Sequence, residues 1–274
     1  AGGLRWNARF HEKSESGAWM DDKGKFHANR TNDAKLAESA FEAASSGLTL
    51  TRVEPGQYKS NPDPPFTTDT LLMKAGSEMS WKPGRTMKVA GELYNAGHIT
   101  YIRTDSTRTN VGAREDVQSY IKKIWGEDHL GKGVVGPDVK GDSANVQDAH
   151  EAIRPTHPSS QSIEGLSTEQ ARLYRLIWAR FAASQMSPSQ YERLSMSASA
   201  SGFEKSFTST ASWRVHRGWE AAFEGIRKEP SIAPPTFNAT VGETLDLDSS
   251  DADSSNPELV EDETKPPARY KQHS

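Results

Sequence analysis

The N-terminal part of the chain has the residue patterns of two strands and a helix. Apolar and polar residues alternate over 4–10 and again over 48–53, which predicts strands with one buried face. Residues 32–46 are rich in alanine and include Asp33 as a candidate N-cap, which predicts a helix between the two strands. This region is therefore predicted to be rich in strands.

The middle of the chain has the apolar spacing of helices. Four segments show it: 67–77, 85–95, 111–125 and 168–186. The second ends at Gly97, a residue type favoured just after a helix. In the third, the spacing places Val117, Ile121 and Ile124 on one face. The fourth begins after a cap at Ser167 or Thr168, and its predicted buried side consists of Leu173, Leu176, Ile177, Trp178 and Phe181.

After Pro188 the strand pattern returns, over 194–198, 203–215 and 236–247. The prolines at 62, 64 and 65 mark a boundary before the helices. We therefore predict an α+β fold, in which residues 1–60 and 191–268 form one discontinuous β-rich domain. Residues 61–190 would be a helical domain inserted into it.

The composition excludes several classes of protein. Of the 274 residues, 34% are hydrophobic and 26% charged, and no apolar run approaches the roughly 20 residues of a membrane-spanning helix. The chain has no cysteine, so it forms no disulfide and has no thiol nucleophile. That composition fits a reducing compartment. The chain begins with Ala1 and no leader pattern follows, so we expect a processed end or a cut inside a longer chain.

The net charge of −4 hides an uneven distribution. Residues 243–263 hold nine acidic residues and no Lys or Arg, and without them the rest of the chain carries +5. Residues 82–123 hold eight basic and four acidic residues, an excess that would attract a phosphate backbone. The same pattern is also typical of an ordinary solvated helix surface, so both interpretations stay open.

Residues 97–106 combine a phenol, a guanidinium, a carboxylate and several hydroxyls. On an extended backbone, Tyr101, Arg103 and Asp105 point to the same side. A phenol has an ordinary pKa of about 10, so it attacks a phosphodiester only when it is activated. An arginine beside it can hold phosphate oxygens and offset the charge that develops. The same pattern also fits a tyrosine that only packs.

A second polar segment lies at 148–156. His150 could donate a hydrogen bond to a phosphate or move a proton, and Arg154 could add positive charge. The alternative is a helix end that Pro155 stops, with exposed polar side chains.

The segment 94–106, which reads Tyr-Asn-Ala-Gly-His-Ile-Thr-Tyr-Ile-Arg-Thr-Asp-Ser, resembles the active-site segment of type IA DNA topoisomerases. Residues 149–156 (Ala-His-Glu-Ala-Ile-Arg-Pro-Thr) resemble the second signature of that family. Three further matches stand in the right order: Pro-Phe-Thr-Thr at 65–68, Tyr-Arg-Leu-Ile-Trp at 174–178 with Phe181, and Lys-Pro-Pro-Ala-Arg-Tyr at 265–270. An ordered series of this length is specific to the family.

The resemblance implies that Tyr101 is the nucleophile. It would attack one DNA strand and form a 5′-phosphotyrosine link with a free 3′-hydroxyl, so that no ATP is needed. Arg103 matches the arginine that positions the scissile phosphate. His150 matches the histidine that contacts the phosphate near the nucleophile. A supporting role in binding DNA or phosphate is implied for Arg154, Thr104, Asp105 and Ser106.

The resemblance also implies a division of labour among domains. The β-rich domain would be the arch that lets the tyrosine-bearing helical domain swing, and residues 269–274 would begin a further, truncated domain. Family members carry acidic metal-binding residues in an N-terminal Toprim domain, and the acidic pattern at 246–253 resembles solvated linker instead. We therefore expect a central gate fragment, inactive alone, with no metal ligand of its own and with Mg²⁺ bound only in the full-length enzyme.

The expected partners are a single-stranded segment of DNA, the Toprim domain and a second DNA-binding domain of the same chain, with no membrane. The expected location is the cytoplasm, at the nucleoid. The alternative function is a non-enzymatic module that binds single-stranded DNA through the basic helical region. Within the family, the gate of a decatenating enzyme or of a reverse gyrase is a further alternative.

Overall fold

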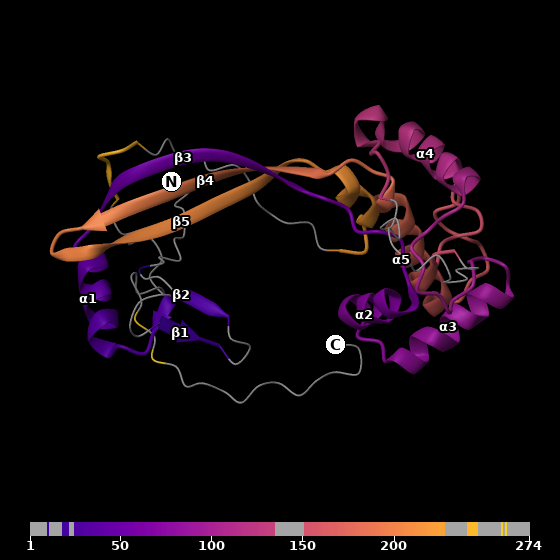
Figure 1. The fold of residues 1–274 in the computed structure, drawn as a ribbon, viewed down its shortest axis with the longest axis horizontal. Coiled ribbons are helices and arrows are strands. Elements are labelled where there is room, and N and C mark those ends of the chain that lie inside the picture. Colours follow the sequence, from indigo (N-terminus) through magenta and orange to yellow (C-terminus); the bar gives the residue numbers. More distant parts are fainter. Residues whose placement is uncertain are drawn as a thin grey trace, which may run out of the picture. The chain divides into compact units, whose positions relative to one another are not determined.

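The computed structural model describes residues 10, 18–21, 25–134, 151–227, 240–245, 259 and 261, and the chain divides into two compact units (Figure 1). Of the described residues, the first unit takes those up to 58, 192–213 and those from 240 onward. The second takes 59–134, 151–191 and 214–227; the sequence prediction had assigned the last range to the β-rich domain. Within the described ranges, no helix has the length and apolar character needed to cross a membrane.

The first unit contains the helix predicted near the N-terminus, α1 (Ala34–Ser45). Its predicted cap is confirmed, since the Asp33 carboxylate accepts a hydrogen bond from the Leu36 N–H at 3.1 Å. Two short antiparallel strands, β1 (Ala18–Met20) and β2 (Phe26–Thr31), were not predicted, because neither has a clear alternation. Residues 4–9 lie outside the described residues.

A four-stranded sheet has the order β5-β4-β3-β6. Its strands are β3 (Leu48–Ser60), β4 (Ser189–Ala200), β5 (Phe203–His216) and β6 (Thr244–Leu245). Figure 1 shows β3, β4 and β5 side by side. Small and apolar residues of α1, β3, β4 and β5 form one core: Ala40, Ala43, Ala44, Leu48, Leu50, Met196, Ala198, Ala200 and Phe207. The predicted α+β fold is confirmed. β3 and β4 are longer than the predicted 48–53 and 194–198, and β5 nearly coincides with 203–215. Of the predicted strand 236–247, the described residues form a strand only at Thr244–Leu245.

The second unit contains the four predicted helices. They are α2 (Thr68–Met79), α3 (Pro83–Asn95), α4 (Val111–Trp125) and α5 (Thr168–Ser184). Two 3₁₀ helices, η1 (Glu127–His129) and η2 (Gly218–Phe223), were not predicted. The five residues predicted on the buried side of α5 are all buried, and so are most of their neighbours on that helix. α5 contacts α3, α4 and η2, and this explains why it is buried on nearly every side.

The apolar face predicted on α4 is buried over only part of its length. Val117 and Ile121 of α4 are fully buried, but Ile124 is 50% exposed. Ile124 lies in the last turn of α4, where Trp125 packs against the core in its place. The Trp125 ring lies 6.0 Å from the Tyr120 ring and 6.3 Å from the Trp178 ring, measured between centroids. At the end of α4 the aromatic side chain of Trp125, and not Ile124, therefore packs against the core.

Candidate active site

Tyr101 and Arg103 lie on irregular backbone between α3 and α4. α3 ends where Gly97 takes the left-handed conformation, with φ at +75°, which glycine adopts without strain. The N–H of His98 then donates to the carbonyl of Leu93 at 2.9 Å and closes the helix end. The chain thus leaves α3 immediately before the segment that carries the phenol.

Exposure alternates along this segment. Tyr101, at 37% exposed, and the side chains of Arg103 and Asp105 reach solvent, whereas those of Ile102 and Thr104 are buried. This is the alternation that extended backbone produces. The phenol, the guanidinium and the carboxylate therefore share the solvent side of the segment.

Hydrogen bonds join the segment before Tyr101 to residues 152–156. The N–H of Thr100 donates to the carbonyl of Arg154 at 3.0 Å, and the N–H of Thr156 donates to that of His98 at 3.0 Å. Ile99 and Pro155 form an isolated antiparallel bridge. The two polar segments found in the sequence, 97–106 and 148–156, are therefore neighbours in space over the residues that the structure describes.

The central helix α5 holds the chain that follows the second segment. The indole N–H of Trp178 donates to the carbonyl of Pro158 at 2.7 Å, and the hydroxyl of Tyr174 donates to that of Ser160 at 2.7 Å. Burial raises the pKa of Tyr174 to about 12, so its hydroxyl stays protonated as a donor. The buried helix α5 thus holds residues 158–160, and the neighbouring residues 152–156 in turn bond to the backbone before Tyr101.

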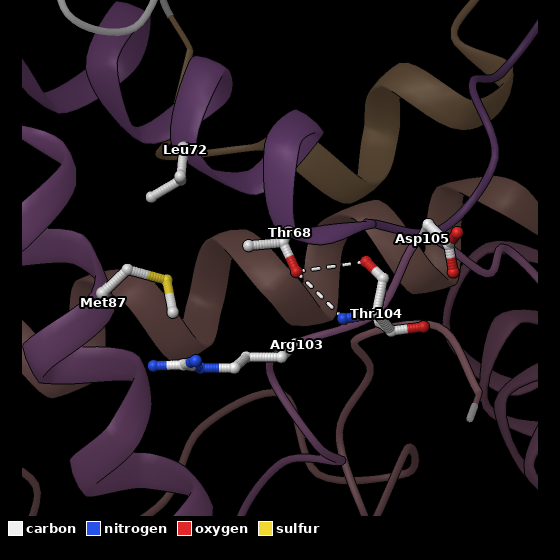
Figure 2. A pocket seen from close by; sticks show the side chains of 6 residues that line it. All are labelled: Thr68, Leu72, Met87, Arg103, Thr104 and Asp105. Carbon is white, nitrogen blue, oxygen red and sulfur yellow. Dashed lines mark hydrogen bonds between the residues drawn. The ribbon is translucent and has the colours of Figure 1, made fainter. Parts of the chain in front are cut away.

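A hollow of about 540 Å³ lies beside Arg103 (Figure 2). Its lining residues come from α2, α3 and the segment after Tyr101: Thr68, Leu72, Met87, Arg103, Thr104 and Asp105. In Figure 2 the Arg103 side chain extends toward Met87, away from Asp105. The hollow therefore has apolar side chains, Leu72 and Met87, beside the Arg103 cation.

The two arginines of the predicted site have different surroundings. The Arg154 side chain is only 12% exposed, its Nε donates to Glu151 Oε2 at 2.6 Å, and its Nη1 donates to the carbonyl of Pro155 at 2.9 Å. Arg103 has no hydrogen-bond or ion-pair partner within the described parts of the chain. Of the two, Arg103 is therefore the cation available to bind an anion from solution.

The hydroxyls predicted to contact DNA turn inward. The side chains of Thr104 and Ser106 are buried. The N–H of Ser106 donates to Thr104 Oγ1 at 3.0 Å, and the N–H of Arg108 donates to Ser106 Oγ at 3.2 Å. Both hydroxyls therefore accept hydrogen bonds from the backbone of their own segment, 104–108. His150 lies outside the described residues.

Tyr94, at the end of α3, is a neighbour of Tyr101 that the sequence interpretation did not assign to the site. The two rings meet edge to face, with centroids 5.4 Å apart, and both are exposed. Its place at the start of the motif 94–106 was the signal that could have pointed to it.

Asp128, His129 and His216 form the one group of possible metal ligands in the described part of the chain, with ligand atoms within 4.8 Å of one another. His129 Nδ1 donates to Asp128 Oδ1 at 3.1 Å and His216 Nε2 to Oδ2 at 3.2 Å, and these bonds hold the pKa of Asp128 below its ordinary value. His216 Nδ1 accepts the N–H of Gly218 at 3.1 Å, so its Nε2 carries the proton and offers no lone pair. Mg²⁺ prefers oxygen ligands, and this group does not fit it.

Comparison with known proteins gives one consistent result. A family profile described as "DNA topoisomerase" matches residues 5–274. "DNA topoisomerase 1" of Vibrio cholerae is 38% identical over 216 residues, which are 77% of this chain and 23% of that protein. "DNA topoisomerase 1" of Thermotoga maritima is 34% identical over 227 residues, which are 78% of this chain and 33% of that protein.

A solved structure agrees with the sequence relatives. Full-length topoisomerase I from Thermotoga maritima matches with a TM-score of 0.65 and 28% sequence identity, over 87% of this chain and 36% of that chain. This chain spans between 23% and 33% of the length of the two curated relatives described above.

Proposed function

This chain belongs to the type IA DNA topoisomerase family, and on that premise we propose that it supplies the nucleophile of an ATP-independent enzyme that relaxes negative supercoils. Tyr101 is the proposed nucleophile and Arg103 the residue that holds the scissile phosphate. The substrate would be a single-stranded segment of DNA, and the place of action the nucleoid.

In the proposed reaction, the Tyr101 hydroxyl oxygen attacks the phosphorus of one DNA strand. A bond forms between this oxygen and phosphorus while the bond from phosphorus to the 3′ oxygen breaks. The phenol loses its proton and the leaving 3′ oxygen gains one, so the products are a 5′-phosphotyrosine and a free 3′-hydroxyl. One ester replaces another, so the link retains the energy needed to rejoin the strand and no ATP is consumed.

The observation that carries the proposal is an exposed phenol close in sequence to a guanidinium that has no partner among the described residues, on a segment held by hydrogen bonds. Tyr101 and Arg103 lie two residues apart on its solvent side. Arg103 can offset the charge that develops on phosphate oxygens in the transition state, since its donors are not used elsewhere in the described residues.

The experiment is a comparison of two tyrosines in the full-length gene product. Tyr101→Phe removes the proposed nucleophile and should abolish the covalent adduct with an end-labelled single-stranded oligonucleotide, seen after denaturing electrophoresis. Tyr94→Phe removes a neighbouring exposed hydroxyl and should leave the adduct within about threefold of wild type, because an exposed side chain outside the reaction costs little. An adduct that survives in Tyr101→Phe would move the nucleophile to another residue.

We further propose that Mg²⁺ and the remaining contacts with DNA are supplied by residues other than those described. The relatives are three to four times longer than the part that this chain matches. By the family resemblance, acidic residues of a Toprim domain would hold Mg²⁺. We propose that this domain and a second DNA-binding domain act together with the segment around Tyr101.

A further inference from the structure

The hydroxyl of Thr68 meets the backbone on both sides of Arg103. Thr68 Oγ1 donates to the carbonyl of Ile102 at 2.8 Å and lies 3.1 Å from that of Thr104. It also accepts the N–H of Thr104 at 2.9 Å. The Ile102 carbonyl and the Thr104 N–H belong to the two peptide units that flank Arg103, so a single side chain from another element restrains both units. Figure 2 shows the contacts between Thr68 and Thr104.

The start of α2 adds a further bond to the same segment. The N–H of Thr68, the first residue of the helix, donates to the carbonyl of Thr104 at 2.9 Å. A free helix N-terminus attracts anions, but here that N–H group is used to hold the loop. The cap itself comes from the preceding residue, because Thr67 Oγ1 accepts the N–H of Thr70 at 3.3 Å. Thr67 and Thr68 therefore have separate roles.

The Arg103 guanidinium has no partner of its own within the described residues. Its position therefore depends on the position of the Arg103 backbone. A flexible backbone there would spread the guanidinium over many positions. Catalysis by positioned charge is sensitive to displacements of about 1 Å. Thr100 makes the corresponding bonds on the other side of Tyr101, donating to Ala152 O at 2.7 Å and accepting the Arg154 N–H at 2.9 Å.

We propose that Thr68 is a positioning residue for strand cleavage, which acts by fixing the backbone of Arg103. The inference rests on the proposed roles of Tyr101 and Arg103. It gives a function to the Pro-Phe-Thr-Thr motif at 65–68, whose second threonine the family resemblance left without a role. Thr68 touches no substrate in this proposal; it acts through Arg103.

The test measures single-turnover cleavage and oligonucleotide affinity in the full-length gene product. Thr68→Val keeps the shape and removes the hydroxyl, and should slow cleavage about 10- to 100-fold with affinity within about twofold. Thr68→Ser keeps the hydroxyl and should restore the rate to within about threefold of wild type. Thr67→Val removes the neighbouring cap, whose side-chain hydrogen bonds in the described structure go to Thr70, and its cleavage rate should stay within about threefold of wild type.

A double variant separates positioning from general damage. If Thr68 acts through Arg103, then adding Thr68→Val to Arg103→Ala should slow cleavage by less than about twofold more. A full and independent loss in that background, an unchanged rate in Thr68→Val, or no rescue by Thr68→Ser would overturn the inference. Should Thr68→Val not fold, hydrogen exchange in the wild-type protein decides, since an unprotected Thr104 amide contradicts the bond on which the proposal depends.

The outcome for Thr68 is distinguishable from failure of the proposed function. If Tyr101→Phe still forms the adduct, the proposed function is wrong whatever Thr68 does. If Tyr101→Phe abolishes the adduct and Thr68→Val cleaves at the wild-type rate, only the positioning role is wrong.

Discussion

Arg103 and Arg154 show how far the surroundings of a residue decide its use. Both are arginines in polar motifs, and both were predicted to bind phosphate. Arg154 is almost buried and donates hydrogen bonds to Glu151 and to the carbonyl of Pro155. Arg103 stands on the solvent side with its donors unused in the described structure. The same guanidinium therefore stabilises the fold at one position and is available for chemistry at the other.

This contrast predicts opposite effects of two alanine substitutions. Arg154→Ala removes hydrogen bonds of a charged group and leaves its partners unpaired, so the free energy of unfolding should fall by about 1.5–3 kcal/mol. Arg103→Ala removes an exposed side chain that has no partner among the described residues, and should change the free energy of unfolding by less than about 0.5 kcal/mol. Urea denaturation followed by circular dichroism measures both.

The same two variants separate stability from activity. Arg103→Ala should lose most strand cleavage while it keeps wild-type stability. If Arg103→Ala were the less stable of the two, the assignment of roles from burial would be wrong.

At the scale of elements, periodicity and caps predicted the helices well. The capping boxes at the starts of α2 and α5 are local arrangements, in which Thr67 pairs with Thr70 and Ser167 with Gln170. The short strands β1 and β2 and the helix η2 have no such local signal and were missed. Elements marked by a cap or by a regular apolar spacing were predictable, and elements without such a pattern were not.

Two glycines, one inside α3 and one just beyond its end, have different backbone conformations. Gly91 is inside the helix with open space where a Cβ would stand, and Gly97 has φ at +75° just beyond the helix, also with open space. Gly91→Ala should raise the free energy of unfolding by up to about 1 kcal/mol, because alanine is the better helix former. Gly97→Ala should lower it by about 1–2 kcal/mol, because a Cβ disfavours the left-handed conformation.

Thermal or urea unfolding of the two glycine variants provides the measurement. Neither substitution meets a neighbouring atom, so a difference in sign isolates the backbone term. Equal effects from both positions would show that the end of α3 is not held as described.

At the scale of the whole molecule, the described residues hold the proposed nucleophile but no set of carboxylates suited to Mg²⁺. The 274-residue chain by itself should therefore leave negatively supercoiled plasmid unrelaxed, while the full-length gene product with Mg²⁺ should relax it. Agarose gel electrophoresis of the plasmid distinguishes the two. The Tyr101→Phe form of the chain, purified in the same way, controls for a contaminating topoisomerase of the expression host.

Relaxation by the chain but not by its Tyr101→Phe form would contradict this prediction. Its own residues, the nine acidic ones at 243–263 among them, would then have to supply what the proposal places elsewhere.

The sequence by itself determined the five α-helices, the longer strands, the α+β class and the choice of Tyr101 and Arg103 as candidates. These follow from periodicity, caps and motifs, all of which act over a few residues. Only the tertiary structure decided that Arg154 is paired, that Ile124 is exposed and that the Thr68 hydroxyl bonds to the backbone on both sides of Arg103. The contacts of Thr68 join residues 34 and 36 positions apart. Such contacts form because helices pack around a common core. A local pattern in the sequence does not show which loop this packing places beside a given hydroxyl.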